Sequence, residues 1–416
     1  MSDQNDVLIV GGGVIGLSCA VALLEAGRSV RVLEAGKTGC GSSHGNCGTI
    51  TPSHAPPLAA PGMIAQAMVW MLTPDAPLYV KPRIDPVLWA WLLRFAGRCN
   101  LRDWQEGTLA KGAMLNDSRS RLATWVRDYA IDCAFDESGV DYVYRDAQRF
   151  EQDASRRDAL RDLGIATEVF NAAAYACEEP AMRDGVVAGV IRFPGDASVR
   201  PNDYVAELAR VVRERGGIIE EGCRVEAISS DANEVVASTS LGVRHGRDAV
   251  LALGAWSPTL AKSLRLKLPI QPGKGYSITY SRPQLAPRRP VVLKEVSVCV
   301  TTWADGYRLG STMEFSGYDS TLNSTRLDAL ERGARAYLRE PVGPERREEW
   351  FGWRPMTYDD VPIVGRAPGH PHLWLATGHG MLGVSMSTGT GQLIADLIGG
   401  RAPAIDPAPY RAERFQ

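Results

Sequence analysis

The sequence lacks the features that mark several protein classes. Its eight cysteines form no C-x-x-C pair, which argues against a zinc framework or a dense disulfide scaffold and makes a reducing cytoplasm the default. Lysine and arginine (46) nearly balance aspartate and glutamate (48), so the charge gives no reason to expect a nucleic-acid partner. No apolar run reaches the length of a membrane span. The composition therefore indicates a globular protein, and its 416 residues are enough for two or three domain-sized units.

The position of the first motif and the aromatic content bear on location. A glycine-rich motif begins close to Met1 and leaves no room for a cleaved signal peptide, so we expect a cytoplasmic protein. Residues 88–93 are rich in aromatic side chains within a helical pattern. Packing in a core is the simpler interpretation, and a peripheral contact with the inner face of the membrane stays open.

Residues 7–34 carry the clearest motif. The apolar run 7–10 is typical of a strand buried on both faces, and it leads into Gly11-Gly12-Gly13-Val14-Ile15-Gly16 and then a helical pattern. Gly11 permits a tight turn, Gly13 lets the backbone approach a pyrophosphate, and Gly16 lets the helix pack close to the strand. The spacing predicts a bound dinucleotide.

The start of that helix and the acid that ends the second strand refine this prediction. The helix start, at Val14 and Ile15, offers free N–H donors and partial positive charge to phosphates. Glu34 can accept hydrogen bonds from a ribose, and its charge would repel the extra phosphate of NADP.

Further loops are candidates for cofactor contact, because ligands bind at the carboxyl ends of strands in open α/β sheets. A small, polar stretch follows Glu34, and glycine-containing loops follow buried strands that end near residues 253 and 376. The last of these loops precedes a helix whose positive end would favour the negative charge of a reduced flavin. The candidate cofactor-binding residues of these segments are Ser42, Ser43, His44, Asn46, Cys47, Gly48, Gly254, Trp256, Gly378, His379, Gly380, Met381, Leu382 and Gly383, and Val225 at the start of another predicted strand is a further candidate.

The order of the patterns predicts an α/β fold with two domains. A discontinuous, Rossmann-like FAD-binding domain is expected over residues 1–85, 190–270 and 346–416. An α+β substrate-binding domain, built on an antiparallel sheet, is expected over residues 86–189 and 271–345. The charged run 345–349 is interpreted as a solvated turn or helix end.

Four blocks of sequence form a familiar combination. They are residues 11–16, residues 46–62, Lys274-Gly275-Tyr276-Ser277, and residues 352–365 followed by 373–380, of which the last is the most specific. With these blocks the chain resembles the FAD-dependent D-amino-acid oxidase superfamily, and within it the bacterial D-amino-acid dehydrogenase branch, over most of its length. Relatives typically have Pro-Asp-Gly where this chain has Tyr358-Asp359-Asp360.

The resemblance implies non-covalent FAD and oxidation of an α-amino acid to an imino acid, which hydrolyses to a 2-oxo acid. Arg354 matches the arginine that binds the substrate carboxylate in that superfamily, a task for which its planar fork is suited. A tyrosine often supports this clamp, and Tyr276 and Tyr307 are both candidates. The clamp would hold the Cα–H against flavin N5 for hydride transfer.

Several choices stay open. The dehydrogenase branch passes its electrons to a quinone or another acceptor, whereas oxidases use O₂. Because residues 290–325 differ from broad D-alanine-type enzymes, a cyclic amine such as D-proline or 4-hydroxy-D-proline is a candidate substrate. The competing functions are a glycine- or sarcosine-type amine oxidase that uses O₂, a non-catalytic FAD-binding subunit, and a nicotinamide-dependent dehydrogenase.

The choice between flavin and nicotinamide yields the first testable prediction. We expect the purified protein to be yellow and to show flavin absorption bands, because the loop at 377–383 and the third nucleotide-binding segment suit FAD. An absorption spectrum before and after soaking in FAD makes the test. A preparation that stays colourless and binds a nicotinamide cofactor instead would contradict it.

Overall fold

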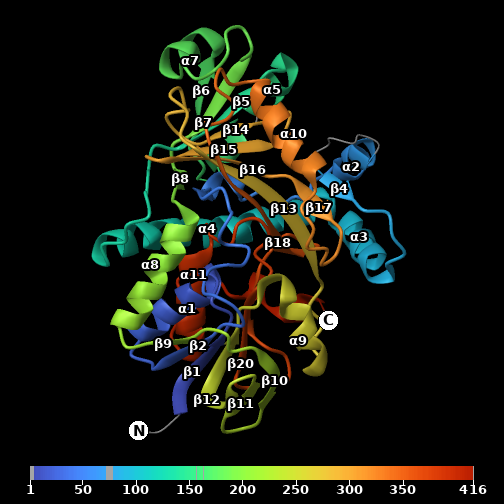
Figure 1. The fold of residues 1–416 in the computed structure, drawn as a ribbon. Coiled ribbons are helices and arrows are strands. Elements are labelled where there is room, and N and C mark those ends of the chain that lie inside the picture. Colours follow the sequence, from blue (N-terminus) through green and yellow to red (C-terminus); the bar gives the residue numbers. More distant parts are fainter. Residues whose placement is uncertain (1–3, 72–77, 156, 163, 416) are drawn as a thin grey trace.

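The structure is a computed structural model, and it describes residues 4–71, 78–155, 157–162 and 164–415. Two large sheets form its frame (Figure 1). Within the described residues no helix is both long and apolar enough to cross a bilayer.

The first sheet is of mixed type and has β1 near its centre. Its strand order is β10-β11-β12-β1-β2-β9, and β20 pairs with the end of β12 and carries β19 on its other side. The pairs that β1 makes with β2 and β12 are parallel, whereas β10, β11 and β12 form an antiparallel meander. The strands are β1 (Gln4–Val10), β2 (Val30–Leu33), β9 (Ile218–Glu220), β10 (Val225–Ser230), β11 (Val235–Thr239), β12 (Gly242–Leu251), β19 (Ile363–Arg366) and β20 (Leu373–Thr377).

The apolar run of β1 contributes side chains to two separate cores, because successive side chains of a strand point to opposite faces of the sheet. Val7 and Ile9 pack against the helices on one face, while Leu8 and Val10 pack into a second cluster on the other. On the first face α1 contacts α8 and α11, and α11 contacts α4. The helices on this face are α1 (Val14–Glu25), α4 (Leu101–Asp128), α8 (Pro201–Glu214) and α11 (Ser387–Ile398). Helix α9 (Ser257–Ser263) packs into the cluster on the other face.

The second sheet is largely antiparallel. Its strand order is β4-β17-β13-β16-β15-β14-β5-β7-β6, and the long β18 pairs with β13. Figure 1 shows this sheet above the first, with α10 over it and β18 reaching down toward the first sheet. The strands are β4 (Leu78–Val80), β5 (Val140–Tyr144), β6 (Glu168–Asn171), β7 (Gly189–Phe193), β13 (Ile270–Ser281), β14 (Val291–Leu293), β15 (Val298–Thr302), β16 (Gly306–Gly310), β17 (Met313–Phe315) and β18 (Arg346–Thr357).

Short elements complete the fold. A two-stranded sheet pairs β3 (Thr49–Ile50) with β8 (Ala197–Ser198). The remaining helices are α2 (Met63–Met71), α3 (Pro86–Arg98), α5 (Ala147–Ala154), α6 (Arg157–Asp162), α7 (Ala172–Glu178), α10 (Ser324–Arg335) and the 3₁₀ turns η1 (Pro52–His54), η2 (Gly254–Trp256), η3 (Ala408–Tyr410) and η4 (Ala412–Phe415). On α3, Leu88 and Trp91 are buried while Trp89 and Leu93 are exposed, so the aromatic-rich run is split between core and surface.

The predicted fold class is confirmed, with differences at element level. The run 345–349 is not a turn or helix end, because β18 begins at Arg346 and its charged side chains have partners: Glu348 lies 2.7 Å from His44, and Arg346 pairs with Glu349. Residues 346–357, assigned above to the FAD-binding domain, lie in the second sheet, as does β4. Conversely, α4 packs on α11 beside the first sheet.

A buried ion pair joins α4 to the loop between β18 and β19. Lys111 Nζ lies 2.6 Å from Asp360 Oδ2, and the two side chains are 2% and 7% exposed. The backbone N–H of Leu58 donates to the same carboxylate oxygen. Asp360 adopts a left-handed conformation (φ 58°), which a non-glycine residue keeps only when its surroundings hold it there.

We expect Lys111→Met to destabilise the protein by about 3–5 kcal/mol, because it leaves the Asp360 carboxylate buried without its cation. Urea unfolding of the single variant and of Lys111→Met/Asp360→Asn makes the measurement. The double variant should recover much of the loss, since no charge is then left unpaired. A single variant as stable as the parent would show that the pair contributes nothing.

Candidate functional site

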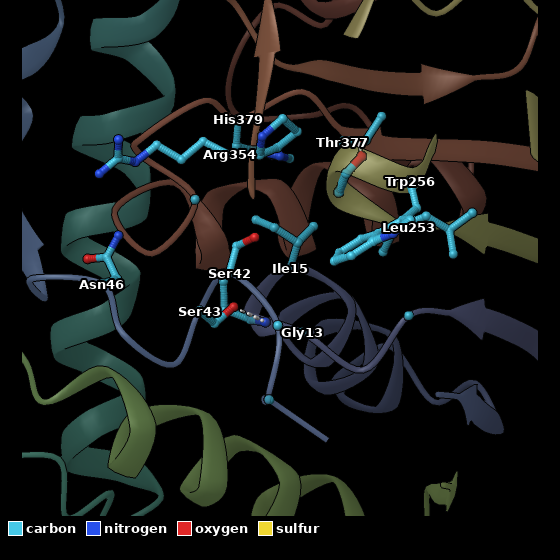
Figure 2. A pocket seen from close by; sticks show the side chains of 18 of the residues that line it. Gly13, Ile15, Ser42, Ser43, Asn46, Leu253, Trp256, Arg354, Thr377 and His379 are labelled. Carbon is cyan, nitrogen blue, oxygen red and sulfur yellow. Dashed lines mark hydrogen bonds between the residues drawn. The ribbon is translucent and has the colours of Figure 1, made fainter. Parts of the chain in front are cut away.

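A cavity of about 800 Å³ lies where the carboxyl ends of the first-sheet strands face the second sheet. Four loops of the first sheet line it: those after β1, β2, β12 and β20. Residues of β13, β14, β15 and β18 form the wall on the second-sheet side. Figure 2 shows the turn at Gly13 with Ser42 and Ser43 on one side of the cavity and Arg354 and His379 on the other.

The turn after β1 has room only for glycine at two positions. Gly11 has φ 113°, and an added Cβ would lie 2.5 Å from the carbonyl oxygen of Ala252. A Cβ on Gly16 would collide with the carbonyl oxygen of Gly11, so this glycine sits behind the turn and lets α1 start there. Gly13 lines the cavity. The turn thus presents bare backbone to the cavity, as a pyrophosphate requires.

Glu34 organises the neighbouring backbone. Its two carboxylate oxygens accept hydrogen bonds from the backbone N–H groups of Gly12 (2.7 Å) and Gly36 (2.8 Å). The residue also lines the cavity, at the end where Val225 does. Its free lone pairs remain available to a ribose hydroxyl.

The polar loop after β2 divides into lining and supporting residues. Ser42, Ser43, Asn46 and Cys47 line the cavity. Ser43 Oγ accepts the backbone N–H of Val14 at 3.1 Å (Figure 2), and the Ser42 hydroxyl donates to the carbonyl of Trp353 on β18. His44 and Gly48 lie behind the wall: His44 binds Glu348, and Gly48 (φ 78°) packs against the Val199 carbonyl.

The loop after β20 lies against the end of β18. Gly380 N–H donates to the Pro355 carbonyl at 3.0 Å, and Met381, Leu382 and Gly383 line the cavity. His379 lies in the same wall with Nε2 2.9 Å from the Thr390 hydroxyl of α11. Burial lowers the pKa of His379 to about 3, so the ring is neutral at physiological pH. Gly378 (φ 75°) supports the turn from behind.

The loop after β12 supplies Gly254 and Trp256 to the wall. The Trp256 ring meets Trp353 edge-on, with 5.4 Å between centroids. This contact joins the first-sheet loop to β18.

Arg354 provides the fixed positive charge of the second-sheet wall. Its guanidinium lies flat over Gly275 of the paired strand β13, where any Cβ would collide with it. Nη1 donates to the Thr312 carbonyl at 2.7 Å. Burial lowers the pKa of Arg354, yet a guanidinium stays charged in proteins. No carboxylate of the described residues forms an ion pair with it, so the charge is free to bind an anion in the cavity.

The two candidate tyrosines have other partners. Tyr276 donates its phenol O–H to Glu314 (3.1 Å), and Tyr307 donates to the Pro341 carbonyl (3.2 Å). Both rings belong to the core cluster that includes side chains of α10. Tyr276 reaches the cavity wall, whereas Tyr307 does not. Each hydroxyl is thus engaged away from Arg354, and the support expected from a tyrosine comes from the Thr312 carbonyl instead.

Several lining residues carried no motif that sequence reasoning could use. His54, from η1, lies 2.9 Å from the Tyr142 hydroxyl, and burial lowers the pKa of the imidazole to about 3. Thr51 is buried, and its hydroxyl has no hydrogen-bond partner in the described structure. Cys299 and Trp350 complete the second-sheet wall. These residues come from distant parts of the chain, and only the tertiary fold brings them together.

Comparisons with known proteins identify the family of this chain. Residues 6–397 match the family of FAD dependent oxidoreductases. The chain is 34% identical to a D-amino acid dehydrogenase of Methylobacterium nodulans, covering 98% of this chain and 99% of that protein. It is 33% identical to a D-amino acid dehydrogenase of Rhizorhabdus wittichii, with 98% and 100% covered.

Solved structures share the fold. The glycine oxidase of Geobacillus kaustophilus superposes with a TM-score of 0.79 at 22% identity, over 99% of both chains. The L-proline dehydrogenase of P. horikoshii gives 0.76 at 18% identity, over 100% of this chain and 98% of that one. At these identities the likeness concerns the fold alone.

The contact between the Arg354 guanidinium and Gly275 yields a prediction about anion binding. In Gly275→Ala the new Cβ displaces the guanidinium, so affinity for a simple carboxylate such as benzoate should fall by about tenfold or more, the loss of one hydrogen bond to a charged group. Titration followed by the flavin absorption spectrum measures it. Gly97→Ala, at an open position on α3, is the matched control and should bind benzoate like the parent. Equal benzoate affinity in both variants would show that the contact with Gly275 does not position the Arg354 guanidinium for anion binding.

Proposed function

This chain belongs to the FAD dependent oxidoreductase family, and from that premise we propose that it works as a D-amino acid dehydrogenase, oxidising the CH–NH₂ or CH–NH group of its substrate. The observation that carries the proposal is Arg354: a guanidinium in the wall of the cavity, hydrogen-bonded to the Thr312 carbonyl and not ion-paired with any described carboxylate. Such a group binds the carboxylate that every α-amino acid carries.

We assign the first-sheet end of the cavity to FAD. The bare backbone at Gly11 and Gly13 would hold the pyrophosphate, and the Glu34 carboxylate would accept hydrogen bonds from the ribose. The polar groups at Ser42, Ser43 and Asn46, together with the loop 379–383, would contact the remainder of the cofactor. Bound FAD supplies the acceptor for the hydride that leaves Cα.

The protein's own part in the reaction is orientation and exclusion of water. The planar fork of Arg354 can make two parallel hydrogen bonds to the substrate carboxylate, which fixes the direction of the Cα–H bond. Aromatic and aliphatic side chains such as Trp350 and Val292 keep the second-sheet wall apolar around it. The substrate amine must lose its ammonium proton before its lone pair can form the C=N bond.

The wall also restricts the substrate. Arg354 is the sole charged side chain that the described strands of the second sheet contribute to the cavity. We therefore propose an uncharged substrate side chain, and a cyclic amine such as D-proline or 4-hydroxy-D-proline fits this rule. The likeness to dehydrogenases supports a quinone or another acceptor rather than O₂.

The function is tested by anaerobic bleaching of the flavin. Uncharged D-amino acids should bleach it, while L-, acidic and basic amino acids should be slow; reoxidation by a quinone should outpace that by air. A glycine- or sarcosine-type oxidase would instead be bleached fastest by glycine or sarcosine and would be reoxidised faster by O₂ than by a quinone. If the protein holds FAD but none of these amino acids bleaches it, the proposed catalytic activity is refuted.

Arg354→Lys and Arg354→Ala test the clamp. Both should raise KM by about tenfold or more, since hydrogen bonds to charged groups contribute about 1.5–3 kcal/mol. The flavin absorbance per protein should not change, because Arg354 lies at the other end of the cavity from the glycine turn. Steady-state kinetics with an active D-amino acid measures KM, and an unchanged value in both variants would remove Arg354 from the site.

A further inference from the structure

The thiol of Cys47 lies in the cavity, against the second-sheet wall. It sits over Gly310 of β16, where an added Cβ would be 2.6 Å from its Sγ. Gly310 is paired with Cys299 of β15 on one side and with Ser277 of β13 on the other. Two thiols from distant parts of the chain therefore line the cavity side by side.

The backbone of Cys47 is fixed from the second sheet. Thr301 on β15 donates its hydroxyl to the Cys47 carbonyl at 2.7 Å. Arg308 on β16 donates to the Asn46 carbonyl at 2.8 Å and to the His44 carbonyl at 3.1 Å. The backbone that carries the thiol is thus held against the second sheet.

Strand geometry places this thiol within reach of an amino acid bound at Arg354. The guanidinium lies over Gly275, two residues along β13 from Ser277, and Ser277 is the neighbour of Gly310. With about 3.3 Å per residue and about 4.8 Å between strands, Sγ and the guanidinium are roughly 8 Å apart. One amino acid whose carboxylate contacts Arg354 can place its amine against Cys47 across that gap.

The charges around Cys47 favour its thiolate. The titratable groups that face it are Cys299 on β15, Arg308 on β16, and Arg354 and Glu348 on β18. The neighbouring Cys299 thiol and the charges of Arg308 and Arg354 lower the pKa of Cys47, against burial, which raises it. The pKa of Cys299 is raised. Glu348 lies 3.7 Å from Arg308 and offsets part of its charge.

The other lining groups are poor proton acceptors at this end of the cavity. The described lining carboxylates, Glu34 and Glu226, belong to first-sheet segments near the glycine turn. His54 has a pKa of about 3, so its imidazole is too weak a base to take up a proton at neutral pH. Burial raises the pKa of Tyr276, whose hydroxyl is engaged with Glu314.

We propose that the Cys47 thiolate, held over Gly310 beside Arg354, accepts the ammonium proton of the bound amino acid. The inference rests on the proposed function and adds a step to it. An N–H bond breaks and an S–H bond forms, and the freed nitrogen lone pair becomes available for the C=N bond. The thiol returns the proton to solvent after the product leaves, so no oxidant or reductant takes part.

The experiment compares the holoenzyme with Cys47→Ala by anaerobic stopped-flow reduction of the flavin between pH 6 and pH 10, using a D-amino acid that bleaches the parent. The parent should keep its rate down to a pH below the ordinary thiol pKa. The variant should be about 10²-fold slower at pH 7 and should approach the parent at high pH, where the amine deprotonates unaided. Cys177→Ala, at an exposed cysteine outside the cavity, is the matched control and should behave like the parent.

Two further readouts separate this role from a structural one. Benzoate affinity should be unchanged in Cys47→Ala, because benzoate has no amine and Arg354 is intact. Alkylation of Cys47 by iodoacetamide, followed by mass spectrometry, should persist below the ordinary thiol pKa and shift to higher pH in Cys299→Ala, which lacks the neighbouring thiol that lowers the pKa of Cys47.

An unchanged pH profile in Cys47→Ala, equal loss of rate at every pH, or loss of benzoate binding would overturn the inference. So would alkylation of Cys47 at the pH typical of a free thiol. If the parent itself is bleached by no amino acid, the proposed function fails first, and the alkylation profile still reports on the thiol.

Discussion

The antiparallel pairing of β13 with β18 is the interaction on which the site depends. It runs in register from Ile270↔Thr357 to Thr279↔Glu348 and so sets Arg354 opposite Gly273, with its guanidinium over Gly275. The far end of β18 then meets the first-sheet side, where the Pro355 carbonyl accepts the N–H of Gly380. A single strand therefore holds the anion-binding group and the cofactor-side loop in a fixed relation, which hydride transfer demands.

Missing side chains are as important to this wall as those present. Gly275 makes room for Arg354, Gly310 for the Cys47 thiol, and Gly352 for the Trp350 ring. Glycine in a strand weakens it, because it has no side chain to pack and loses more entropy on folding. The long pairing of β13 with β18 offsets that cost, and functional side chains lie flat on the sheet where they would otherwise point away from it.

Sequence reasoning succeeded where the signal was local and failed where it depended on register. The strand, glycine turn and helix of residues 4–25 form as predicted, because each glycine's role follows from its neighbours in the chain. Strand alternation puts Gly275, not Tyr276, on the face that carries Arg354, and this becomes visible only once the pairing with β18 is known. The charged start of β18 is predicted wrongly as a turn or helix end for a similar reason, because partners such as His44 and Glu331 lie far away in sequence. His54 and Cys299 had no motif at all.

The thiol and the guanidinium together solve a problem of buried charge. An unpaired charge in an apolar cavity is costly, and Arg354 has no described carboxylate partner. A Cys47 thiolate balances that charge before the substrate arrives. When a zwitterionic amino acid binds, its carboxylate takes over the guanidinium, and transfer of the ammonium proton neutralises the thiolate and the amine together. The net charge of the cavity stays constant throughout, so the proton can move without leaving an uncompensated charge beside the apolar wall.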